Sequence, residues 1–142
     1  MPNLPKTMKA LVLDEFGGTP VYKDVPVPKP KYNEVLIKIV YAPLNPMDLS
    51  FLKGYYSSVK KLPVTIGFEG CGVVVASGGN HSQNYWIISK IQVTNLKNEL
   101  SFFQFIFLGG FYGWTLVGKK VAVYVQRSPH GTFAEYAITN VF

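Results

Sequence analysis

Closely spaced glycines and prolines restrict the fold of this sequence more than any other feature. The 142 residues include 13 Gly and 10 Pro, distributed over most of the length. Both residue types interrupt helices and mark turns, so this spacing favours many short strands over a few long helices. Hydrophobic residues make up 48% and charged residues 15% of the chain, which is typical of a sequence that folds around a core. The length corresponds to about one domain.

Short runs rich in β-branched and aromatic residues recur along the chain. Within 34–41, Val35, Ile37 and Ile39 lie on one face of the expected strand, and Lys38 marks the more solvated opposite face. The same criteria predict strands at 8–14, 21–25, 34–41, 64–77, 119–125 and 132–138.

One short helix is expected between two of these strands. Asn45 is a favourable N-cap, Pro46 suits the first helical position, and Asp48 complements the positive end of the helix. Gly54 is a suitable terminator. These signals predict a helix of about two turns over 46–53.

Glycines also interrupt the run at 64–77. Gly67, Gly70 and Gly72 fall within six residues of an otherwise apolar segment. Glycine inside a strand pattern indicates a bend or a close approach of another backbone segment. We therefore expect the chain to bend or pack tightly here.

The charge distribution argues against a nucleic-acid-binding protein. The net charge is +6, but the only adjacent basic pairs are 60–61 and 119–120. A nucleic-acid groove requires a denser basic stripe. The segment 100–118 carries no charge, but it contains Gln104 and four glycines and is not a convincing transmembrane helix.

Cysteine usage and the N-terminal sequence bear on the cellular compartment. Cys71 is the single cysteine, so an internal disulfide is impossible. The first seven residues contain no apolar region of the secretory type. Both features predict a protein of a reducing, cytoplasmic compartment.

Four segments, taken together, resemble a known family. They are MKALVLDEFGG, EVLIKIVYAPLNPMD, LPVTIGFEGCGVVVASGG and VGKKVAVYV…GTFAEYAIT, and they cover 8–80 and about 114–139. In this order they resemble the N-terminal, GroES-like domain of the medium-chain dehydrogenase/reductase superfamily, in its zinc-independent quinone oxidoreductase and enoyl reductase branch. The resemblance implies a mainly β fold: a partly open β-barrel with one or two short helices, forming a single domain over 1–142.

The residue inventory excludes the zinc sites of that superfamily. In zinc-dependent members a Cys occupies the position of Asn45 and a His that of Phe68, and their structural zinc uses four cysteines. Asn45 is a poor zinc ligand, Phe68 cannot bind a metal, and Cys71 is alone. Catalytic zinc needs about three protein ligands, so we expect no metal.

The resemblance implies hydride transfer from NADPH to a quinone or a conjugated enone. It places Asn45 and Tyr56 near the nicotinamide and the substrate, where an amide and a phenol can orient both reactants. It assigns no catalytic residue. Structural roles stay open for both: Asn45 as the helix cap, and Tyr56 as a half-buried aromatic beside Tyr55. Glu69 is expected to be a structural carboxylate.

The dinucleotide-binding half of such an enzyme is missing from the sequence. No G-x-G-x-x-G motif occurs, and only 139–142 follow the last expected strand. A Rossmann unit needs at least about 30 residues. We therefore expect the substrate-side domain of the oxidoreductase, truncated, inactive alone and without tight NADPH binding. The alternative is a non-catalytic interaction or structural module that retains the barrel.

An atypical insertion at 81–110 interrupts the family pattern. Residues 81–108 contain no Gly, Pro, Ala or Asp, whereas the flanking sequence is rich in glycine. Two interpretations remain open. The segment is translated intron or a gene-model error, or it is a genuine insertion whose Trp86 and clustered phenylalanines form a partner-binding surface.

Overall fold

The structure is a computed structural model, and it describes residues 4–56, 61–78, 116–126 and 128–140. The insertion predicted at 81–110 lies outside these residues. The elements are β1 (Thr7–Leu13), β2 (Val21–Pro26), β3 (Glu34–Tyr41), α1 (Pro46–Leu52), β4 (Val64–Thr65), β5 (Glu69–Ser77), β6 (Lys120–Tyr124) and β7 (Tyr136–Asn140).

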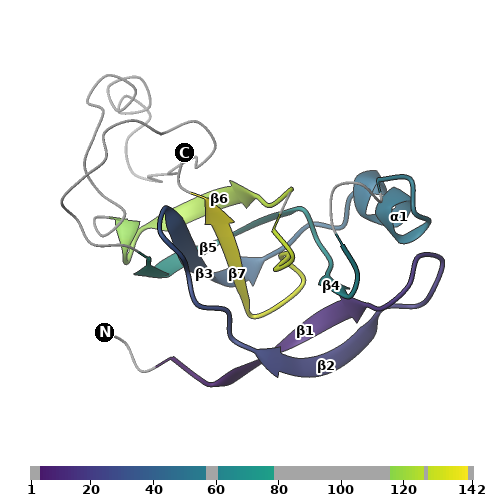
Figure 1. Cartoon of the computed structure of the whole chain (residues 1–142). Coiled ribbons are helices and arrows are strands. Elements are labelled where there is room, and N and C mark those ends of the chain that lie inside the picture. Colours follow the sequence, from purple (N-terminus) through teal and green to yellow (C-terminus); the bar gives the residue numbers. More distant parts are fainter. Residues whose placement is uncertain (1–3, 57–60, 79–115, 127, 141–142) are drawn as a thin grey trace, which may run out of the picture.

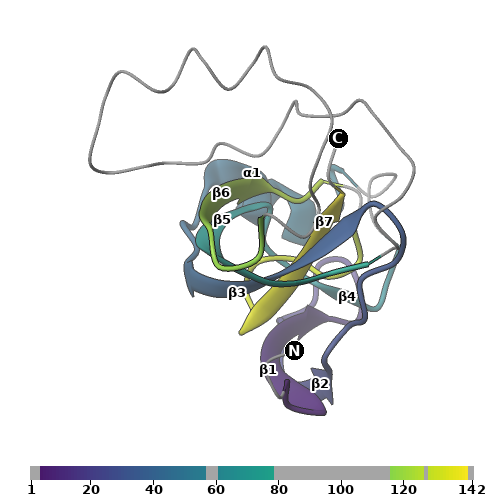
Figure 2. The ribbon, with the colours of Figure 1, turned by 90° about the vertical axis from the view of Figure 1, so that its left-hand side faces the viewer.

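The strands form two sheets. A three-stranded sheet has the order β2-β1-β4, and a four-stranded sheet has the order β6-β5-β3-β7. All the strand pairs are antiparallel. A bridge between Ala10 and Ala134 joins the sheets without closing them into a barrel (Figures 1 and 2). The predicted mainly β, partly open GroES-like architecture with a short helix is confirmed.

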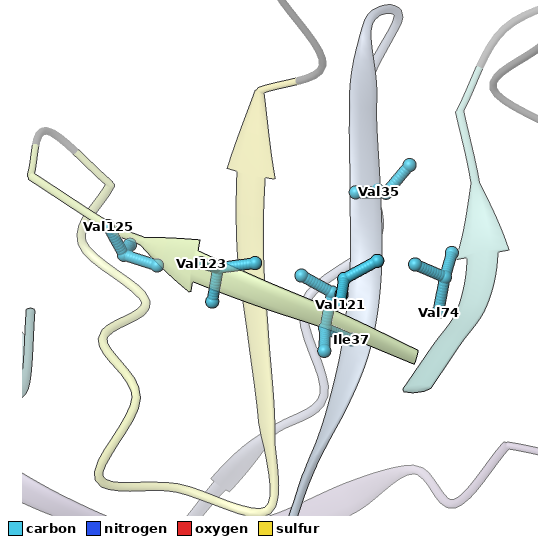
Figure 3. Packing of buried hydrophobic residues seen from close by; sticks show 6 residues of the cluster. All are labelled: Val35, Ile37, Val74, Val121, Val123 and Val125. Atoms are coloured by element: carbon cyan, nitrogen blue, oxygen red, sulfur yellow. The ribbon is translucent and has the colours of Figure 1, made fainter. Parts of the chain in front are cut away.

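Both faces of the four-stranded sheet bury apolar side chains at β3. The inward alternation predicted for 34–41 is present, because Val35 and Ile37 are fully buried while Lys38 is exposed. They belong to a cluster on one face, shown in Figure 3: Val35, Ile37, Val74, Val121, Val123 and Val125. Leu36 on the other face is also fully buried, in a cluster that spans the two sheets: Met8, Leu36, Tyr136 and Ile138.

The run predicted as one strand at 64–77 is divided between the two sheets. β4 pairs with β1, and β5 pairs with β3 and β6. The bend expected from the glycines lies between them, where Gly67 has φ +95°. A Cβ at Gly67 would lie 2.5 Å from Thr132 Oγ1, so this position needs both the backbone freedom and the small size of glycine.

The last strand begins later than the predicted range 132–138. β7 spans Tyr136–Asn140, because the residues before it cross from one sheet to the other. The Thr132 N–H donates to Gly67 O at 3.2 Å and the Phe133 N–H to Ile66 O at 3.0 Å. These bonds hold the crossing segment against the bend at Gly67.

Helix α1 begins and ends where its capping residues predict. Asn45 is the N-cap with extended backbone, Pro46 is the first helical residue, and Gly54 follows the C-cap residue with φ +89°. Phe51 is buried and packs edge-on against both Phe16 and Phe68. The helix is thereby fixed to the turn after β1 and to the start of β5. Within the described ranges, no helix has the length and hydropathy needed to cross a bilayer.

Candidate functional site

Asn45 and Glu69 form the first contact of the site. Asn45 precedes α1, and Glu69 is the first residue of β5. The Asn45 Nδ2 donates a hydrogen bond to Glu69 Oε2 at 2.9 Å. A carboxylate can only accept, so this bond assigns the amide nitrogen to the Glu69 side and turns Oδ1 away from it. Glu69 therefore orients the side chain of Asn45.

Asp48 joins the helix N-terminus to the same region. Its carboxyl group is buried, with the residue 2% exposed. Asp48 Oδ2 accepts the backbone N–H of Asn45 at 2.8 Å, and Oδ1 accepts that of Phe68 at 3.2 Å. Asp48 thus lies at the helix start, as expected, and it also ties α1 to the residue preceding Glu69.

Tyr124 lies directly across the strands from Glu69. Their Cα atoms are register partners of β5 and β6, and the Tyr124 ring stacks on Phe68 with a centroid separation of 6.4 Å. The Tyr124 hydroxyl donates to the Met47 sulfur at 3.7 Å. Burial raises the pKa of the Tyr124 phenol above its ordinary value, with smaller contributions from Glu69, Tyr56 and Asp48.

Tyr56 belongs to the same neighbourhood. It follows α1, and 44% of its surface is exposed. Its phenol makes one of the smaller contributions to the raised pKa of Tyr124. The structure therefore places Asn45 in a polar cluster with Glu69 and Tyr124, and Tyr56 is linked to this cluster through its contribution to the pKa of Tyr124. Their roles in binding stay a prediction.

The cluster suits a neutral polar ligand better than a phosphate. Asp48 and Glu69 place two carboxyl groups at the N-terminal end of α1, and each already accepts hydrogen bonds from the chain. The electrostatic contributions at Tyr124 come from carboxyl and phenol groups. An amide and phenols can bind neutral polar groups, whereas a phosphate would face like charge here.

No metal centre emerges from the described residues, which hold no group of three or more His, Cys, Asp or Glu side chains placed to bind an ion. Phe68, at the position of a zinc-ligating His in other members, is 2% exposed and packs between Phe51 and Tyr124. The prediction of a zinc-free protein continues to rest on Asn45, Phe68 and the single Cys71.

One member of the cluster, Tyr124, is not singled out by the sequence. Glu69, expected to be a structural carboxylate, accepts the Asn45 side-chain N–H, which is compatible with that expectation. Tyr124 is the penultimate residue of the run KKVAVYV and the last residue of β6, and a polar-tipped aromatic at the end of a strand is the one signal that could have marked it. The pairing of Tyr124 with Glu69 joins residues more than fifty positions apart, which only the sheet register reveals.

Comparison with known families gives a match to the alcohol dehydrogenase GroES-like domain over residues 31–141. The chain belongs to this family. The matched residues of this GroES-like domain include the whole polar cluster and six of its described elements and exclude β1 and β2.

Solved structures with the same fold carry the comparison further. A putative NADPH:quinone reductase from Mesorhizobium loti is 28% identical, with a TM-score of 0.68 over 98% of this chain and 36% of that one. A mycobacterial quinone oxidoreductase is 27% identical, with a TM-score of 0.61 over 94% and 31%. A mycobacterial structure complexed with NADPH is 28% identical, with a TM-score of 0.60 over 94% and 32%.

These relatives confirm the resemblance to the quinone oxidoreductase branch of the medium-chain dehydrogenase/reductase superfamily. The resemblance covers only part of these relatives, because this GroES-like domain spans about a third of the length of each of the three solved chains.

Proposed function

We propose that this chain is the substrate-side domain of a zinc-independent, NADPH-dependent oxidoreductase that transfers a hydride to a quinone or a conjugated enone. The observation that supports this most directly is the Asn45–Glu69 hydrogen bond beside Tyr124. It places an oriented amide and a phenol together in a domain whose solved relatives include an NADPH:quinone reductase and an NADPH complex.

The chain's own residues would bind and orient the reactants. NADPH, when bound, supplies the hydride, and the protein supplies position and electrostatics. Asn45 Oδ1, turned away from Glu69, suits the amide hydrogens of a carboxamide. The phenols of Tyr56 and Tyr124 suit the carbonyl oxygen of an acceptor. Because hydride transfer of this kind needs no Lewis acid, the lack of zinc ligands at Asn45 and Phe68 is compatible with the reaction.

We further propose that the chain is inactive alone and binds NADPH weakly. Two carboxyl groups at the α1 N-terminus disfavour phosphate at this cluster, and the sequence contains no glycine-rich pyrophosphate motif. We therefore expect this chain to bind NADPH weakly, through the nicotinamide end of the cofactor. The single cysteine supports a reducing, cytoplasmic location.

Titration with NADPH tests the proposal. Nucleotide fluorescence should show no tight binding, and amide NMR shifts at high NADPH concentration should centre on Asn45, Tyr56 and Tyr124. Asn45→Ala should remove these shifts, because the oriented amide is lost. Asn140→Ala, at the exposed end of β7, is the matched control and should leave them unchanged.

Three results would count against this function. Shifts confined to other surfaces would favour a non-catalytic interaction module. Submicromolar NADPH affinity, or quinone reduction by the chain alone, would contradict the proposed dependence on a separate cofactor-binding half.

For the segment 81–110, we propose an intron-derived or mis-predicted origin, and a transcript that contains it in frame would instead support a genuine insertion.

A further inference from the structure

Binding of the proposed electron acceptors requires a hydrogen-bond donor in the site. The carbonyl oxygen of a quinone or an enone only accepts hydrogen bonds, so the protein must supply a donor. The carboxylates of Asp48 and Glu69 are acceptors, and both already receive N–H bonds from the chain. The donors in the cluster are therefore the Asn45 amide and the phenols of Tyr56 and Tyr124.

Asn45 has little donor capacity left. One of the two hydrogens on its side-chain nitrogen goes to Glu69 at 2.9 Å, which leaves one side-chain N–H, and its backbone N–H goes to Asp48 at 2.8 Å. Only a rotation that aimed both side-chain hydrogens at a carbonyl ligand would break the Glu69 bond and leave a carboxylate facing Oδ1. Asn45 therefore offers Oδ1, an acceptor that suits the carboxamide of the cofactor, and a single side-chain N–H for the carbonyl of a substrate.

The two phenols differ in how firmly they are held. Tyr56 follows the end of α1 and is 44% exposed, so fixing its side chain on a ligand costs conformational entropy. Tyr124 ends a strand, and its ring stacks on the buried Phe68. A donor that is already held in place binds a ligand at lower entropic cost and needs no rearrangement.

The hydrogen bond that Tyr124 makes is also easy to replace. Its hydroxyl donates to the thioether sulfur of Met47 at 3.7 Å, and such a sulfur is a weak acceptor. Exchange for a carbonyl oxygen gives a stronger bond without breaking a polar network. Burial also favours the protonated phenol, because it raises the pKa of Tyr124, so the group remains a donor at neutral pH.

We infer that the Tyr124 hydroxyl donates the hydrogen bond that binds the carbonyl oxygen of the electron acceptor, with Glu69 as a positioning residue that turns Asn45 toward the cofactor. The inference rests on the proposed function and names the residue that selects carbonyl substrates. The same bond would stabilise the negative charge that develops on this oxygen during reduction.

Binding of a small enone to the 142-residue chain tests this role without requiring turnover. The probe is 3-methyl-2-cyclohexen-1-one, which is soluble and whose β-methyl group slows addition of the Cys71 thiol. Tyr124→Phe keeps the ring that stacks on Phe68 and removes only the hydroxyl. It should weaken enone binding about fivefold, the effect expected from one neutral hydrogen bond. Tyr22→Phe, the same change at a 65% exposed tyrosine of β2, should bind like the unaltered chain.

A second readout follows the hydroxyl itself. In protein labelled with carbon-13 at the tyrosine ζ position, enone should shift the Tyr124 signal, which is assigned by its loss in Tyr124→Phe. Equal enone affinity of Tyr124→Phe and the unaltered chain, or an unshifted Tyr124 signal, would overturn the inference and leave the proposed function standing. Failure of the unaltered chain to bind enone at all would overturn both.

Discussion

At the scale of single residues, a buried carboxyl group organises the site. Asp48 is 2% exposed and accepts two backbone N–H groups, from Asn45 and from Phe68. Asn45 forms a side-chain hydrogen bond with Glu69, and Phe68 immediately precedes Glu69. Asp48 therefore does more than complement the helix dipole, because it holds the two segments that carry the polar cluster next to each other.

Replacing Asp48 should destabilise the fold substantially. Asp48→Ala removes two hydrogen bonds to a charged acceptor in a buried place, and the free energy of unfolding should fall by about 2–3 kcal/mol. Urea denaturation measures this change. The matched control is Asp14→Ala, which removes a surface ion pair to Lys23 whose carboxylate side is 55% exposed. It should change stability by about 0.5 kcal/mol or less, and equal effects of the two substitutions would contradict the role given to Asp48.

At the scale of secondary-structure elements, α1 is placed by aromatic packing. Phe51 lies 5.5 Å from Phe16 and 5.4 Å from Phe68 between ring centroids, edge-on in both cases. Phe68 in turn stacks on Tyr124. A chain of rings thus links the helix to the phenol of the site, so the packing of α1 and the position of Tyr124 are coupled.

Truncation of Phe51 should therefore affect both stability and the site. Phe51→Ala should lower the free energy of unfolding by about 3–5 kcal/mol, because it leaves a cavity among packed rings. It should also broaden or shift the Tyr124 ring signals in NMR spectra of the folded protein. Leu49→Ala, on the same helix at a residue that is 49% exposed, should do neither. An unperturbed Tyr124 in folded Phe51→Ala would refute the coupling.

At the scale of the whole molecule, the two sheets share one core. Met8 of β1 lies in the same buried cluster as Leu36 of β3 and Tyr136 of β7. Bonds such as Leu11 N–H to Phe133 O, 2.8 Å, cross between the sheets as well. The cluster of Met8, Leu36, Tyr136 and Ile138 is complete only when the two sheets pack together, so the described residues should unfold as one cooperative unit.

Met8→Ala tests this cooperativity. Loss of a fully buried Met should cost about 2–5 kcal/mol, and amide hydrogen exchange should show reduced protection in β3 and β7 as well as in β1. Val21→Ala, at a residue of β2 that is 49% exposed, should leave exchange nearly unchanged. Reduced protection confined to the three-stranded sheet would show that the sheets unfold separately.

The sequence by itself determined the local structure of this protein. The alternation of apolar and polar residues predicted the strand at 34–41 with its observed bounds. The capping and turn-forming residues predicted the helix cap at Asn45 and the helix end at Gly54. Four segments in order predicted the family, which the match over residues 31–141 confirmed. These signals depend on neighbours a few positions apart, where backbone propensity and side-chain period dominate.

Only the tertiary structure decided how distant segments meet. It divided 64–77 between two sheets and moved the start of the last strand from 132 to Tyr136, because 132–135 cross between the sheets and bond to both of them. It also brought Glu69 to Asn45 and Tyr124 to Glu69. The physical reason is that strand register and sheet-to-sheet crossing depend on packing across the whole core, which no local window of sequence contains.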